Sequence, residues 1–204
     1  MLVTSSTIVQ EVKAMSETGL ALMAYFYCSF TAKAKQDVRG LLTSLIAQLC
    51  AKSDPCYNII SGLYSRNNAG SHQPEDEALA NCLIDMLKLS GQPTIYIIVD
   101  ALDECPNTGI VSPREQVLKL VQELVGLCLP NLRICLTSRP EADIQADLVS
   151  LASHTVSLHD QYGQTKDITN YIRFIVHSDR SMRAWGEQHR ELVIDTLSRK
   201  ADGM

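Results

Sequence analysis

Residues 94–105, TIYIIVDALDEC, decide how we interpret this chain. The apolar residues Ile95 to Val99 follow one another without a polar interruption. Such an unbroken run is typical of a strand that is buried on both faces of a parallel sheet. The run ends in Asp100, Asp103 and Glu104. In open α/β sheets the carboxyl ends of the strands form the ligand crevice, so this segment predicts both a strand and the place of a site.

Two other apolar runs, Leu20 to Phe26 and Leu132 to Thr137, have the same strand-like character, and we expect both to be buried on both faces. Apolar residues recur at helical spacing between these runs, from Val38 to Leu49 and from Leu79 to Leu87. Strands that alternate with helices are joined by helical crossovers and therefore lie parallel. The pattern predicts an α/β fold with a doubly wound parallel sheet.

The helix before the third run has its own start signal. Ser112 is placed as the N-cap, Pro113 at the first helical position, and Glu115 three residues after the cap. Apolar residues from Val117 to Val125 then follow at helical spacing. The polar stretch from Asn67 to Glu77 is interpreted as a surface connection inside the domain.

The last part of the chain, beyond Leu158, is interpreted as helical. Ile168, Tyr171, Ile172 and Ile175 would share one helix face, and a second amphipathic pattern surrounds Leu192 to Leu197. This part is either the end of the same domain or the start of a helical one. We assign residues 1–160 to the core and residues 161–204 to a helical extension of the same module. Trp185 would either anchor these helices or contact a partner.

Composition excludes several classes of protein. The net charge is −5, which disfavours nucleic acid and anionic membranes as partners, and no apolar stretch is long enough to cross a bilayer. The seven cysteines are odd in number and form no C-x-x-C pair. We therefore expect reduced, mainly buried thiols in a cytoplasmic protein. The histidines have no metal-ligand spacing with these cysteines.

The acidic strand end carries the first candidate chemistry. Asp100, at the end of the strand, is placed where a carboxylate can hold Mg²⁺ beside a phosphate group. Asp103 or Glu104, a few residues on, could polarise an attacking water. The alternative is that these carboxylates are an ordinary solvated strand end.

A second polar strand end follows the third run, in residues 132–140, LRICLTSRP. Thr137 and Ser138 bring two hydroxyl groups to this strand end, and Arg139 brings a permanent, fork-shaped cation. Such an arginine could contact a γ-phosphate or bridge it to the carboxylates of the neighbouring strand. Standing alone, Arg139 would be interpreted as a solvated residue before Pro140.

Taken together, the two segments and the capped helix between them resemble the Walker-B and sensor-1 elements of NACHT domains in the STAND class of signalling ATPases and GTPases. Residues 20–30 and 37–49 look like the second strand and following helix of nephrocystin-like NACHT proteins of filamentous fungi. The wording ALDEC at 101–105 and TSRPE at 137–141 is typical of that group. The resemblance covers nearly the whole chain.

The resemblance implies a P-loop NTPase type of fold and a set of roles. Asp100 would bind Mg²⁺, Asp103 and Glu104 would serve hydrolysis, and Arg139 would sense the γ-phosphate of ATP or GTP, with Thr137 and Ser138 beside it. Members of this family are cytoplasmic multidomain switches for signal transduction. An effector domain precedes the NTPase module, and ankyrin or WD repeats follow it. The implied partners are other NACHT-type chains or these further domains, with no nucleic acid and no membrane.

One family element is absent from the sequence. A phosphate-binding loop has the form G-x-x-x-x-G-K-[ST], and the chain has no Gly-Lys dipeptide. Residues 4–15 resemble the helix that follows the loop, so we expect a truncated module without its first strand and phosphate loop. The chain by itself would then hold no cofactor. Two functions stay open: a switch NTPase that is inactive as the isolated chain, and a non-catalytic interaction module derived from a NACHT domain.

Overall fold

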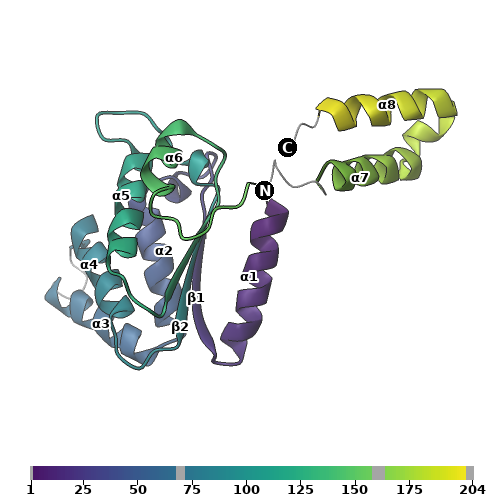
Figure 1. The fold of residues 1–204 in the computed structure, drawn as a ribbon. Helices are drawn as coiled ribbons and strands as arrows, with labels where there is room; N and C mark the ends of the chain where they lie inside the picture. The colour runs from purple at the N-terminus through teal and green to yellow at the C-terminus, as the bar shows by residue number, and fades with distance from the viewer. Residues whose placement is uncertain (1, 68–71, 158–163, 201–204) are drawn as a thin grey trace. The chain divides into compact units, whose positions relative to one another are not determined.

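The computed structural model describes residues 2–67, 72–157 and 164–200 (Figure 1). The chain divides into two compact units: unit 1 is Met1–Ala152 and unit 2 is Ser153–Met204. The boundary that the sequence analysis placed at residue 160 lies outside the described residues. Among the helices that the structure describes, none is long and apolar enough to span a bilayer.

Unit 1 contains a parallel sheet of three strands. They are β1 (Ala21–Tyr27), β2 (Thr94–Asp100) and β3 (Leu132–Leu136), in the order β1-β2-β3. Tyr27 pairs with Asp100 and Val99 with Leu136, so the carboxyl ends of all three strands lie on the same side of the sheet. The predicted α/β class and the three strands are confirmed, and the fold is compatible with a P-loop type. Because the strands follow chain order, the doubly wound arrangement and the truncation stay predictions.

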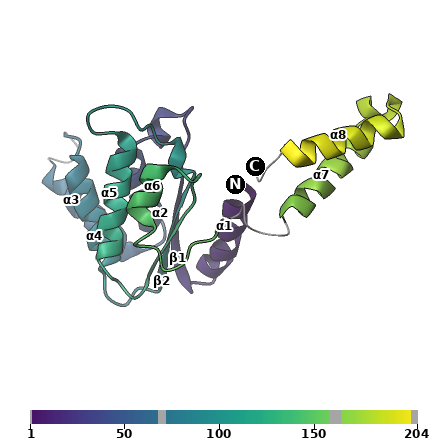
Figure 2. The ribbon, with the colours of Figure 1, turned by 45° about the horizontal axis from the view of Figure 1, so that its top comes forward.

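Helices cover both faces of this sheet, as Figures 1 and 2 show. On one face, Val12 packs with Met23 and Ile98 in a small buried cluster. The other face carries the main core, in which Leu41, Leu83 and other helix residues pack on the sheet. The helix of the first face is α1 (Leu2–Glu17); the larger layer is formed by α2 (Val38–Cys50), α3 (Asp54–Arg66), α4 (Asp76–Leu87) and α5 (Pro113–Gly126), and α6 (Ala142–Leu148) follows β3.

The helices α2, α3 and α5 begin at side-chain caps that the sequence provides. Ser112 Oγ accepts a hydrogen bond from Glu115 N at 3.0 Å, which confirms the predicted start of α5. Asp37 caps α2 in the same way, since its Oδ1 accepts from Gly40 N at 2.8 Å. The helix α3 was not predicted, although Ser53 caps it and a proline stands in its first turn.

The third strand differs from its prediction. Strands β1 and β2 are largely buried, as expected, but no residue of β3 is fully buried and Arg133 is exposed. The expectation that β3 is buried on both faces is therefore wrong. The physical reason is its place at the edge of the sheet, where it pairs only with β2 among the described residues.

Unit 2 contains α7 (Gln164–Ser178), the short 3-10 helix η4 (Ser181–Ala184) and α8 (Glu187–Lys200). Val176 and Ile194 are its buried apolar residues within the described part of the chain. The prediction that this part of the chain is helical is confirmed by α7 and α8. Of the apolar residues in the predicted patterns, Tyr171 and Leu192 are exposed. Two helices alone can bury only a narrow line of side chains. Trp185, at 45% exposure, is not enclosed by them.

Candidate functional site

Asp100 is the last residue of β2, and its side chain is held by the neighbouring strand end. The residue is only 1% exposed. The hydroxyl of Thr137, one residue beyond β3, donates a hydrogen bond to Asp100 Oδ1 and accepts one from Ala101 N at 3.1 Å. A buried carboxylate needs such partners, because an unpaired buried charge is costly. The structure therefore brings together two of the candidate residues, Asp100 and Thr137, from neighbouring strand ends.

The chain turns sharply after Asp100. Ala101 has a left-handed backbone with φ of 56°, and the 3-10 helix η3 (Leu102–Glu104) follows at once. The amide of Leu102 donates to Thr137 O at 3.0 Å, and the Leu102 side chain is fully buried. Non-glycine residues seldom adopt this conformation, so tertiary contacts must hold it. The turn fixes where Asp103 and Glu104 leave the backbone.

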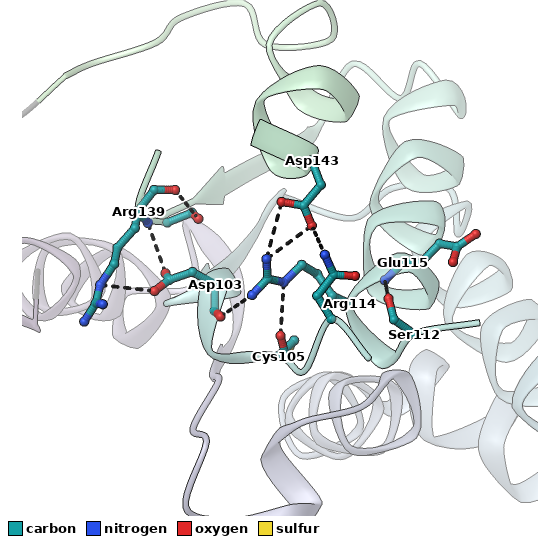
Figure 3. Close-up of polar contacts among 9 residues, drawn as sticks. Asp103, Cys105, Ser112, Arg114, Glu115, Arg139 and Asp143 are labelled. Atoms are coloured by element: carbon teal, nitrogen blue, oxygen red, sulfur yellow. Dashed lines mark hydrogen bonds and ion pairs between the residues drawn. The ribbon is translucent and has the colours of Figure 1, made fainter. Parts of the chain in front are cut away.

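Asp103 and Arg139 are direct partners (Figure 3). Asp103 Oδ1 accepts a hydrogen bond from Arg139 N at 3.0 Å, and Oδ2 lies 3.4 Å from Arg139 Nε. The Asp103 side chain is 8% exposed, whereas that of Arg139 is 72% exposed. The backbone hydrogen bond orients the carboxylate, and the ion pair with the exposed guanidinium adds little stability. Ser138 contacts the same turn, because its hydroxyl donates to Arg139 O at 2.7 Å.

Glu104 has a different partner from the other two acids. Its Oε2 accepts a hydrogen bond from Phe30 N at 3.1 Å, in the segment that follows β1. The side chains of Asp100, Asp103 and Glu104 therefore reach three separate partners. Among the described residues, these three carboxylates do not bring their oxygens within 4.8 Å of one another. In this conformation they are neighbours on one edge of the sheet and not one ready ligand set.

The sequence analysis missed the residue that holds this loop in place. Arg114, at the start of α5, is 8% exposed, and Figure 3 shows it bridging the acidic loop and α6. Its Nε donates to Cys105 O at 3.0 Å, and a second nitrogen donates to Asp103 O at 2.6 Å. A third nitrogen contacts Asp143 at 3.2 Å. An arginine in the first turn of a capped helix with an apolar face was the only signal in the sequence.

The negative charge of Asp100 contributes to raised pKa values of neighbouring groups, among them Tyr27 and Cys135. Burial raises the pKa of the Tyr27 hydroxyl, and the charge of Asp100 adds to the increase. Burial likewise raises the pKa of Cys135, again with a contribution from Asp100. Both effects are those expected of an anion in a poorly solvated place. Such a place would favour a cation over further anions.

Unit 2 carries a separate group of polar side chains. His177, Glu187 and Glu191 are exposed, and their possible ligand atoms lie within 4.8 Å of one another. The sequence analysis considered histidine only with cysteine and so missed this group. Each glutamate also has an arginine partner, Arg190 for Glu187 at 3.2 Å and Arg173 for Glu191 at 3.6 Å. Exposed ion pairs of this kind are common on helices and indicate no function.

Comparison with known proteins identifies the family. A family model described as "Nephrocystin 3, N-terminal" matches residues 2–139, which include both the Asp100–Glu104 loop and the Thr137–Arg139 strand end. No curated protein and no solved structure gave a match. The nephrocystin-like resemblance seen in the sequence is confirmed, since the matched region covers most of the chain. The chain belongs to the nephrocystin 3 N-terminal family.

Proposed function

We propose that unit 1 carries part of the nucleoside-triphosphate site of a NACHT-type signalling switch of the STAND class, in which ATP or GTP controls the assembly of a larger receptor. The observation that carries the proposal is the contact between the ends of β2 and β3. The acidic loop of one strand and Arg139 of the other meet at 3.0 Å and 3.4 Å. Ligands of open α/β sheets bind at this edge.

The residues at the end of β2 fit a magnesium ion by their chemistry. Asp100 offers a carboxylate and Thr137 a hydroxyl, and both are hard oxygen donors of the kind that Mg²⁺ prefers. Their hydrogen bond would have to open for either oxygen to reach a metal ion. A bound Mg²⁺ would neutralise charge on the phosphates of the nucleotide. Asp100 would hold the ion, and Thr137 would keep the Asp100 carboxylate oriented.

The two following acids would have different tasks. Both oxygens of Asp103 face Arg139, so Asp103 is assigned to position that arginine near the γ-phosphate. Glu104 receives one hydrogen bond, from Phe30 N, at one carboxylate oxygen. The other oxygen is then the better candidate to orient an attacking water. Ser138 supports the Arg139 backbone at the same edge.

Nucleotide binding by this chain alone should be weak. The 204 residues contain no Gly-Lys dipeptide, so they lack the glycine-rich loop and lysine that supply most phosphate contacts in such sites. Asp100 and Arg139 cannot replace these contacts, since the first repels phosphate. Calorimetric titration of the chain with Mg-ATP and Mg-GTP tests this expectation. A low-micromolar dissociation constant, on the order of −8 kcal/mol, would contradict it.

The roles of the acids can be separated in a version to which a strand and phosphate-binding loop have been added before residue 2. We expect Asp100→Ala to weaken Mg²⁺-dependent binding, because the metal ligand is lost. We expect Glu104→Gln to preserve binding and to slow hydrolysis by about 10²–10⁴-fold, the usual contribution of a general base. Glu123→Gln, on an exposed position of α5, is the matched control. Unchanged turnover in both site variants would remove the Walker-B assignment.

A second function is favoured by the partners that the acidic residues already have within the protein. Thr137 donates a hydrogen bond to Asp100, and Arg139 forms an ion pair with Asp103. A non-catalytic interaction module for related NACHT-type chains would need no more than this. Mixing the chain with a nucleotide-competent family member separates the two functions. Association that is independent of nucleotide and unchanged by Asp100→Ala would favour the interaction module.

A further inference from the structure

Two buried thiols lie side by side near the carboxyl ends of the strands, next to the acidic loop. Cys28 directly follows β1, and Cys105 directly follows η3. Their Sγ atoms are 3.5 Å apart, although the residues are 77 positions apart in the chain. The two residues are 5% and 1% exposed. After the turn at Ala101, η3 lies beside the segment that follows β1, as the hydrogen bond from Phe30 N to Glu104 Oε2 shows.

Both backbones are fixed by hydrogen bonds that do not involve the sulfurs. Cys28 N donates to Asp100 O at 2.9 Å, which extends the β1–β2 pairing by one residue. Cys105 O accepts from Arg114 Nε at 3.0 Å, and Cys105 N donates to Leu102 O at 3.2 Å. The sulfurs are therefore held near each other by the fold. The sulfurs would have to approach from 3.5 Å to the bonding distance of a disulfide, about 2.05 Å.

We propose that Cys28 and Cys105 are a modification site, a dithiol that a peroxide oxidises to an intramolecular disulfide. One thiol reacts first with the peroxide, giving a sulfenic acid and a molecule of water. The second thiol then attacks this sulfur, and a second water leaves as the S–S bond forms. Two thiols are oxidised by two electrons while one peroxide is reduced to two waters. A thiol reductant reverses the reaction.

The disulfide would join the segment after β1 to the acidic loop, two segments that a hydrogen bond already connects. Phe30, two residues after Cys28, donates its amide hydrogen to Glu104 Oε2, and Glu104 directly precedes Cys105. A covalent bond between the two cysteines would fix the distance between these neighbours. Oxidation would therefore restrict the movement of Glu104 away from β1. This property of the fold is independent of whether the chain binds nucleotide.

The other thiols of the chain offer a built-in comparison. Cys128 is exposed and is the thiol that solvent reaches most easily. It has no cysteine beside it, because Cys28 and Cys105 form the one cysteine–cysteine hydrogen bond among the described residues. Reaction at Cys128 alone would give a mixed or intermolecular product. Proximity, and not exposure, therefore distinguishes the Cys28–Cys105 pair. We expect Cys128 to react faster and Cys28 with Cys105 to give the intramolecular product.

The test uses the full reduced chain and hydrogen peroxide. After graded exposure, remaining thiols are blocked with N-ethylmaleimide, and the protein is digested with trypsin without reductant. Tryptic cleavage separates Cys28 in residues 14–33 from Cys105 in residues 89–114, and neither peptide has another cysteine. Mass spectrometry should find these two peptides linked, with the loss of two hydrogens, as the main intramolecular product. The link should disappear after reduction.

Two variants complete the experiment. Cys128→Ser should keep the linked peptides, and Cys105→Ser should abolish them and leave Cys28 open to blocking once the chain is unfolded. The oxidised wild-type chain should also unfold at a higher urea concentration than the reduced chain, because the bridge closes a long loop. The proposal is overturned if Cys28 and Cys105 are both recovered as blocked thiols after Cys128 has been fully oxidised. It is also overturned if Cys28 is found mainly linked to another cysteine.

Discussion

The two outer strands of the sheet are protected in very different ways. At the β1 edge, the side-chain amide of Gln48 acts like a peptide group of a further strand: its Oε1 accepts from Tyr25 N at 3.1 Å, and its Nε2 donates to Tyr25 O at 2.7 Å. At the other edge, β3 pairs only with β2 within the described part of the chain. Five of the seven residues of β1 are buried, and none of the five in β3.

The difference shows which edge can accept another strand. Thr137 N donates to Val99 O, so Thr137, Cys135 and Arg133 direct their backbone groups toward β2. The alternate residues Leu132, Ile134 and Leu136 therefore direct theirs toward the open edge. Exposed strand edges are sites of association, whereas an edge that is already hydrogen-bonded to a side chain is blocked. We expect a further strand to pair along β3 more readily than along β1, where Gln48 occupies the backbone groups of Tyr25.

The largest expected effect of the open β3 edge is self-association or loose packing of the unmodified chain. At tens of micromolar we expect self-association or loose packing, because the open edge of β3 exposes backbone groups and half-buried apolar side chains. Light scattering coupled to size-exclusion chromatography measures the mass, and circular dichroism follows unfolding. A monomer with a cooperative, reversible unfolding transition above about 55 °C, within the range of intact mesophilic domains, would contradict this prediction. It would show that the open edge of β3 causes neither self-association nor loose packing.

A proline in β3 should reduce this association. Ile134→Pro removes a backbone N–H that faces the open edge, so an incoming strand loses one hydrogen bond and meets a steric block. We expect association to weaken by about tenfold or more, since a net hydrogen bond and the block together exceed about 1.4 kcal/mol.

The matched control is Arg133→Pro, one residue away. It removes an N–H that faces β2, so it should destabilise the sheet and increase association. Chromatography of both variants at equal concentration makes the comparison. Equal behaviour of the two variants would mean that the contact does not use the β3 edge.

A smaller effect is expected at the protected edge. Gln48→Leu leaves the Tyr25 N–H and C=O without their side-chain partner, and we expect a loss of about 1–3 kcal/mol in the free energy of unfolding. Gln48→Glu keeps an acceptor for Tyr25 N but loses the donor to Tyr25 O. If both hydrogen bonds contribute, its free energy of unfolding should lie between those of the wild-type chain and the leucine variant. Urea denaturation should be followed by circular dichroism and not by tryptophan fluorescence. The one tryptophan, Trp185, lies in unit 2, whereas the substitution is in unit 1. An unchanged midpoint for the leucine variant would contradict the proposed role of Gln48.

Much of the fold could be predicted because strands and helices have local signals. The unbroken run before Asp100 gave β2, and the Ser112–Pro113 start gave α5, both close to their observed bounds. The third strand shows the limit of this reasoning. Its apolar residues from Leu132 to Leu136 resemble those of a central strand, but burial depends on the neighbours that tertiary structure supplies.

The place of the candidate site was predicted, because parallel strands end at one side of the sheet and bring the polar residues after β2 and β3 together. Which residues pair there, Asp100 with Thr137 and Asp103 with Arg139, was not predicted. The support of the acidic loop by Arg114 was not predicted. Its bonds to backbone carbonyls depend on the turn at Ala101, which no local pattern specifies.

The sequence by itself determined the α/β class, the strand ends that carry the polar residues, and the family resemblance. These follow from hydrophobic periodicity and from residue types at fixed spacing, which are local properties. Tertiary structure alone decided that Gln48 caps Tyr25 at one edge of the sheet, that β3 stays half-exposed, and that Cys28 lies beside Cys105. Each of these joins groups far apart in the chain, and only the packing of helices on the sheet fixes which distant groups meet.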